Sequence, residues 1–202
     1  MTLSEKIQIP LFPLSVFLLP GERTQLHIFE KRYQQLFSEL EKGDPYFGIP
    51  FSMGGKTMRY GTRCKLVRVI KRYNSGESDV LIEAQGIFEL TEFTSMKEGK
   101  LYPFGTVILK RDLSKELAST EVLEAYESLD GSLSGSDVPL HLVDSPYVLA
   151  IMASLGFSSE EKFRFIQLDS SKKRDESLLG LIKMMNQLIT QEQATENGIY
   201  LS

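Results

Sequence analysis

Histidine and cysteine, the side chains that most often act as nucleophiles, bases or metal ligands, are scarce in this chain. The sequence holds one cysteine, Cys64, and two histidines, His27 and His141. Zinc sites usually combine several Cys and His ligands at short spacing, which these three residues cannot supply. Cys64 alternates with Leu66 in a strand pattern, which predicts a small buried residue, and His27 is predicted to lie at the surface. We expect no metal, no cofactor and no catalytic residue.

Two further patterns are superficially similar to catalytic motifs. The segment 53–57 ends in Gly-Lys-Thr like a P-loop, but Pro50 stands where that motif needs its first glycine. Its surroundings predict a hairpin tip between two strands. The carboxylate pairs at 160–161 and 175–176 both fall at predicted helix starts, where acidic residues suit the helix dipole. These observations favour a protein that is not an enzyme.

A run of basic residues without an intervening acid lies in a predicted long strand. Because side chains alternate along a strand, the basic residues divide between its two faces. The favoured interpretation is an exposed or edge strand whose charged side chains prevent unwanted pairing with other strands. The alternatives are a phosphate-binding strip with Tyr60 and Tyr73 as stacking platforms, or a surface for acidic protein partners. The run comprises Arg59, Arg63, Lys65, Arg68, Lys71 and Arg72.

Composition narrows the classes of function. The net charge is −4 and the pI about 5.4, which disfavours binding to phosphate backbones.

The N-terminal segment lacks the basic start and unbroken apolar run of a signal peptide, and no apolar run is long enough to span a membrane. A single cysteine suits a reducing compartment. We expect a cytoplasmic protein that does not associate with membranes.

The hydrophobic periodicity changes along the chain and predicts an α+β fold. Short apolar runs separated by turn residues predict about seven to nine strands up to residue 111, interrupted by one helix over 30–42. After residue 112 the periodicity is helical, and 130–142 is a Ser, Gly and Asp-rich linker. We therefore predict two subdomains, 1–112 and 113–202. The expected helices of the second are 116–129, 145–155, one opened by a Ser158–Glu161 capping box, and 175–191.

The N-terminal segment resembles a known family. Ile9-Pro10-Leu11-Phe12-Pro13-Leu14 leads to Leu19-Pro20-Gly21, followed by Ile28-Phe29-Glu30 and Arg32-Tyr33. This series is similar to the N-terminal substrate-binding domain of Lon proteases, and most closely to its free-standing bacterial versions. The resemblance covers about residues 7–190 and departs from the family pattern at Ile87-Phe88, where the usual arginine is missing.

The resemblance implies a PUA-like β-barrel followed by a C-terminal helical bundle. It also implies recognition of unfolded or extended polypeptide, without ATPase or protease activity, and a protease or chaperone as a further partner. PUA-like barrels elsewhere often bind RNA, so nucleic-acid binding through the basic run is the alternative. A third hypothesis is an enzyme or a small-molecule-binding protein that uses a cleft between the barrel and the bundle.

The resemblance and the apolar pattern together select two sets of candidate residues. A proline-broken run supplies exposed apolar surface for a polypeptide, unless its side chains form the barrel core instead. The family motif is expected to be structural, with Glu30 and Arg32 fixing the helix to the barrel. The polypeptide-binding set is Phe12, Leu14, Phe17 and Leu18, and the motif set is Pro20, Gly21, Phe29, Glu30, Arg32 and Tyr33.

Overall fold

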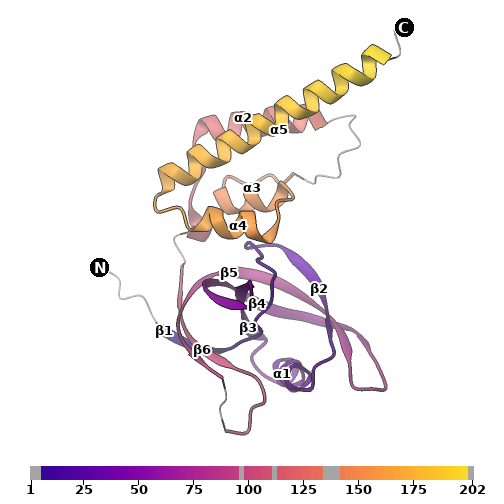
Figure 1. Cartoon of the computed structure of the whole chain (residues 1–202), viewed down its shortest axis with the longest axis vertical. Coiled ribbons are helices and arrows are strands. Elements are labelled where there is room, and N and C mark those ends of the chain that lie inside the picture. Colours follow the sequence, from indigo (N-terminus) through magenta and orange to yellow (C-terminus); the bar gives the residue numbers. More distant parts are fainter. Residues whose placement is uncertain (1–5, 96–97, 111–112, 134–141, 200–202) are drawn as a thin grey trace. The chain divides into compact units, whose positions relative to one another are not determined.

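The fold is described from a computed structural model, which describes residues 6–95, 98–110, 113–133 and 142–199. The chain divides into two compact units, Met1–Ser114 and Lys115–Ser202. The first holds all the strands and one helix, and the second is built from helices (Figure 1). We call them the strand unit and the helical unit.

One antiparallel sheet organises the strand unit. Five of its six strands follow the order β1-β6-β5-β4-β3, and the sixth, β2, pairs with the first part of β5. The strand β5 runs through Gly86 without a break, and the register of the β4–β5 pair shifts at that point. The strands are β1 (Lys6–Pro10), β2 (Arg23–Ile28), β3 (Tyr46–Met53), β4 (Lys56–Arg72), β5 (Ser78–Thr94) and β6 (Phe104–Leu109).

The segment after β1 closes the sheet on itself. Leu11 and Leu14 form parallel bridges to Gly48 and Phe51 of β3. The amide of Phe12 donates to the Gly48 carbonyl at 2.8 Å, and the Leu14 carbonyl accepts from Ser52 at 2.8 Å. Proline has no amide hydrogen, and the prolines of this segment stand between the residues that make these bonds. The closed sheet fits the expected barrel, and its PUA-like character stays a prediction.

A tight hairpin joins β3 to β4. Gly54 and Gly55 form its two-residue turn, with φ values of 59° and 76°. Positive φ at both central positions is the requirement of a type I′ turn, and glycine meets it without strain. The segment that resembled a P-loop is thus a hairpin tip, as predicted.

Helix α1 (Lys31–Lys42) presents the predicted apolar stripe to the sheet. Its buried residues are Tyr33, Leu36, Phe37 and Leu40, spaced as one face of a helix. They pack in a core with strand residues such as Phe47 and Ile82. The helix begins one residue later than predicted, so Glu30 is its N-terminal flanking residue and not part of the first turn.

Among the residues that the structure describes, four α-helices form the helical unit, and a short 3-10 helix lies at its boundary in the chain. The predicted capping box is confirmed: Ser158 accepts from the Glu161 amide, and the Glu161 carboxylate accepts from the Ser158 amide. The last helix is longer than predicted, and on it Ile189 is buried whereas Leu188 is 56% exposed. The elements are η1 (Leu113–Lys115), which straddles the unit boundary, α2 (Thr120–Leu133), α3 (Val148–Ser154), α4 (Ser159–Ile166) and α5 (Ser171–Ile199).

Candidate functional site

The proline-broken apolar run is largely buried, which favours the alternative that its side chains form the barrel core over an exposed surface for polypeptide. Phe12 and Leu18 belong to the sheet–helix core, with 6% and 7% of their surface exposed. The Phe12 ring lies 4.2 Å from that of Tyr33, centroid to centroid, and Phe17 packs edge-on against Phe51 at 5.7 Å. Leu14 is half-buried. Closure of the sheet through this segment turns these side chains inward.

The Pro20-Gly21 turn leads the chain from the buried run into β2. Gly21 adopts a φ of 92°, which favours glycine, and its amide donates to the Ala84 carbonyl at 2.9 Å. Next to it, the Glu22 carboxylate accepts from the Leu19 amide at 2.6 Å. The Gly21 bond attaches the turn to β5, and the Glu22 bond closes the turn on itself.

Glu30 and Arg32 contact each other and the first turn of α1, and their expected role in fixing this helix to the barrel stays a prediction. Arg32 donates to the Glu30 carboxylate at 2.8 Å, and its guanidinium lies 4.6 Å from the centre of the Tyr33 ring. Tyr33 is the motif residue that enters the core. Phe29 is 62% exposed and stacks beside His27, with ring centroids 6.2 Å apart. Sequence alternation did not single out this exposed ring.

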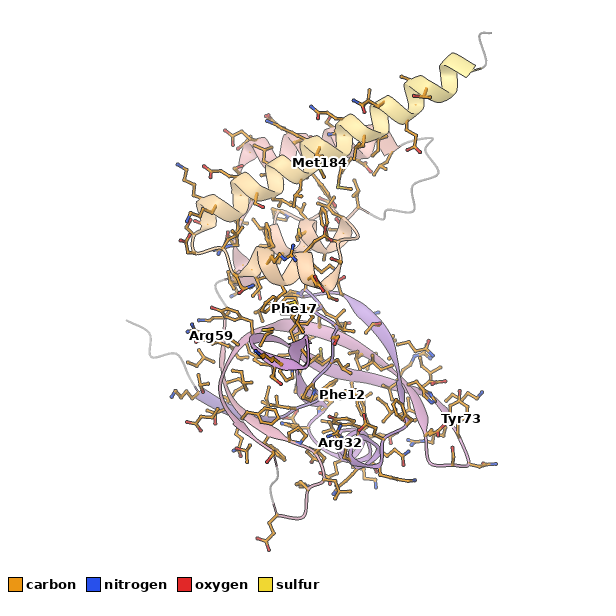
Figure 2. The ribbon with its side chains drawn as sticks, in the orientation of Figure 1. Phe12, Phe17, Arg32, Arg59, Tyr73 and Met184 are labelled. Atoms are coloured by element: carbon orange, nitrogen blue, oxygen red, sulfur yellow. The ribbon has the colours of Figure 1, made fainter. Side chains whose placement is uncertain are left out.

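The basic run does not form one continuous strip. Arg59 is engaged by the Glu89 carboxylate, and the Arg63 guanidinium lies 3.9 Å from the centre of the Tyr46 ring. Arg59 at one end of the run and Tyr73, just beyond the other, lie on opposite sides of the strand unit (Figure 2). The two proposed stacking platforms therefore do not lie together. Lys65 is exposed on the part of β4 that pairs with β3.

The last three basic residues of the run gather where β4 leaves β3. Arg72 is paired with Glu41 of α1 at 2.5 Å, and Lys71 lies 4.4 Å from the centre of the Tyr73 ring. Arg68 is exposed and has no ion-pair partner among the residues that the structure describes. This part of β4 therefore carries three exposed basic side chains, of which only Arg72 has an ion-pair partner among the residues that the structure describes.

A groove lies between this part of β4 and the end of α1. Its volume is about 660 Å³ and it is open to solvent. One wall is the strand from residue 66 to 72 and the other is the end of α1 with the turn after it. We call it the edge groove. The residues on the helix side are Leu40, Glu41, Gly43 and Pro45.

The residues with potential for catalysis or metal binding take other roles. Cys64 is buried, as predicted, and burial raises the pKa of its thiol well above the usual value. His27 is exposed and its Nδ1 lies 2.7 Å from the Asp79 carboxylate. His141 falls outside the described residues. Within the described ranges, no three His, Cys, Asp or Glu side chains gather as a metal site.

No helix in the described part of the chain combines the length and apolar character needed to cross a membrane.

The fold and sequence place the chain in a family. The model of the ATP-dependent protease La (LON) substrate-binding domain matches residues 8–184, and the chain belongs to this family. This confirms the resemblance seen in the N-terminal motif. No curated protein gives a significant sequence match.

Two solved structures share the fold. The Lon N-terminal domain protein from Xanthomonas campestris is 22% identical, with a TM-score of 0.67, over 86% of this chain and 98% of that one. The N-terminal domain of Mycobacterium avium complex Lon protease is 11% identical, with a TM-score of 0.60, over 88% of this chain and 98% of that one. At these identities the likeness shows a common fold and not a common activity.

Proposed function

We propose that the chain is a non-enzymatic module that recognises unfolded or extended polypeptide. The observation that carries this proposal is the match of residues 8–184 to a domain described as substrate-binding in an ATP-dependent protease. The substrates of a protease are polypeptides, so a domain of this family that binds them needs a surface for extended chain. A protease or chaperone that receives the bound polypeptide is the further partner we propose, in the cytoplasm.

The residue chemistry is compatible with binding without catalysis. The one cysteine is buried with a raised thiol pKa, which makes it a poor nucleophile. The exposed histidine is engaged by Asp79 on an open strand surface. Neither residue lines the edge groove.

Nucleic-acid binding through the basic run is the second candidate. The exposed Arg68, Lys71 and Arg72 favour it, since cations near a sheet can contact phosphates. The net charge of −4 and the carboxylate contacts of Arg59 and Arg72 weaken it. A strip of phosphate contacts would require the basic residues to follow one line, and here they divide.

Fluorescence anisotropy distinguishes the two functions. The protein is titrated against a labelled, reduced and carboxymethylated polypeptide and against a labelled single-stranded RNA, at about 50 mM and about 500 mM salt. We expect saturable polypeptide binding that persists at high salt. RNA binding that collapses with salt, without polypeptide binding, would replace this proposal by the second candidate.

A further inference from the structure

The second half of β4 is a free strand edge. Pairing with β3 ends at Tyr46 and Lys65, and one further bond joins the Leu66 amide to the Pro45 carbonyl at 2.9 Å. On its other side β4 pairs with β5 as far as Arg72 and Ser78. Among the described residues, none outside β5 shares a backbone hydrogen bond with 67–72. Such an edge offers amide and carbonyl groups to an added strand.

The edge groove provides space for an added strand. It follows the β4 edge along 66–72 and is bounded by the end of α1. Six residues of extended chain span about 20 Å, so a short peptide segment suffices to pair along 67–72. The groove is open to solvent, so a segment within a long chain can enter it without a free terminus.

Two irregularities expose apolar side chains on this edge. The register of β4 against β5 shifts between Leu66 and Arg68 and again between Val69 and Lys71. Val67 and Ile70, the residues left over at the two shifts, are 40% and 41% exposed. A bulge alone can protect an edge from unwanted pairing, but exposed β-branched side chains do the opposite because they offer apolar contact.

The charge on this edge selects an acidic partner. Arg68, Lys71 and Arg72 all line the groove, and Glu41 is its one acidic residue. The Glu41–Arg72 pair is exposed, at 41% and 60%, so solvent screens it and an incoming carboxylate can replace Glu41. A positive groove on a chain of net charge −4 is complementary to acidic and not to basic segments.

We propose that the edge groove binds an extended polypeptide segment that alternates acidic and apolar side chains, added as a strand along 67–72. The backbone of the segment would complete the edge, its carboxylates would meet Arg68 and Lys71, and its apolar side chains would contact Val67 and Ile70. This inference rests on the proposed polypeptide recognition, for which it names a site and a substrate class.

The test uses a matched pair of charge-reversal variants. Arg68→Glu/Lys71→Glu alters the groove, and Lys56→Glu/Lys65→Glu makes the same change of net charge at exposed residues on the β3-paired part of β4. The probe is a capped peptide of about ten residues that alternates Glu with Val or Thr, and the comparison peptide carries Lys in place of Glu. Thermal melts of both variants establish that they are folded.

The groove variant is expected to bind the acidic peptide at least about tenfold more weakly than the unaltered protein, and the control variant within about twofold. The Lys-containing peptide should bind more weakly to the unaltered protein. Equal losses in both variants would show attraction by overall charge and would overturn the proposed site.

Hydrogen exchange tests the added strand directly. Peptide binding should slow exchange of amides within 67–72, while amides of β2, which pairs with β5 on the far side from this edge of β4, stay unchanged. Binding without new protection at 67–72 would contradict strand addition.

The carboxymethylated polypeptide separates failure of the site from failure of the function. If it binds the unaltered protein and the groove variant equally, the site is wrong and polypeptide recognition stands. If it does not bind the unaltered protein, both proposals fail. RNA that displaces the acidic peptide, with affinity lost in the groove variant, would assign the groove to nucleic acid and overturn the inference.

Discussion

Arg174 and Glu116 form an ion pair in the helical unit with little access to solvent. Arg174 Nη2 lies 2.6 Å from Glu116 Oε2, and the side chains are only 10% and 13% exposed. The same guanidinium donates to the Leu168 carbonyl at 2.5 Å. The pair therefore ties the segment before α2 to the first turn of α5 and to the turn that precedes it.

Removing one partner of this pair should destabilise the protein strongly. Glu116→Ala leaves a buried guanidinium without its carboxylate, so we expect the free energy of unfolding to fall by about 3 kcal/mol. Urea denaturation measures the change. The control is Glu160→Ala, since the Glu160–Arg164 pair is exposed and should contribute less than about 0.5 kcal/mol. Similar losses in both variants would contradict a special role for the buried pair.

Truncation of Phe12 should reveal a core residue. Phe12→Ala removes a ring packed against Tyr33 and Phe37, which should lower the free energy of unfolding by about 3 kcal/mol or more. Phe29→Ala is the matched control, because that ring is 62% exposed, and its effect should be within about 0.5 kcal/mol. The opposite result is also possible to recognise: if Phe12→Ala keeps its stability but loses polypeptide binding, Phe12 belongs to the binding surface and not to the core.

The Glu89 carboxyl should make the free energy of unfolding depend on pH in the acidic range. The hydrogen bond from Lys110 lowers the pKa of the Glu89 carboxyl, burial opposes this, and the bond from Arg59 adds to the lowering. Because the folded pKa lies below the unfolded value of about 4.3, the stabilisation is complete above that pH. It is lost as pH falls through the folded pKa.

Glu89→Gln should therefore flatten the acid side of the stability profile. Urea denaturation between about pH 6 and about pH 3 measures it, and the loss of stability on acidification should be smaller in this variant than in the unaltered protein. Glu192→Gln, at an exposed position of α5, is the control and should leave the profile unchanged. A profile of equal steepness for both variants would rule out the role of Glu89.

Two glycines should respond to alanine in opposite directions. A Cβ on Gly61 would lie 2.5 Å from the Ile49 carbonyl oxygen and 2.5 Å from Phe88, so Gly61→Ala should destabilise by about 2 kcal/mol. Gly180 lies in α5 with nothing within 4 Å of an added Cβ, so Gly180→Ala should stabilise by about 0.5–1 kcal/mol. Thermal melts show whether each substitution raises or lowers the stability of the protein. Destabilisation by Gly180→Ala would contradict the open surroundings of Gly180.

Patterns that depend on neighbours in the sequence were predictable. The α1 stripe, the Ser158–Glu161 capping box and the hairpin glycines follow from local hydrogen bonds and side-chain spacing. Helix ends were less well predicted, since α5 extends from Ser171 to Ile199 beyond the expected range. Its buried stripe also passes through Ile189, because packing against α2 decides which side of a long helix is covered.

The sequence by itself determined the family, the change from strands to helices, and the scarcity of residues for catalysis. Only the tertiary structure decided that the run from Phe12 to Leu18 is largely buried, and that the basic run ends on a free strand edge. Both outcomes depend on which strands pair across long sequence separations: Leu11 and Leu14 with β3, and β4 with β3 only as far as Lys65. Alternation along one strand gives two faces, and its pairing partners decide which face is buried and which edge is free.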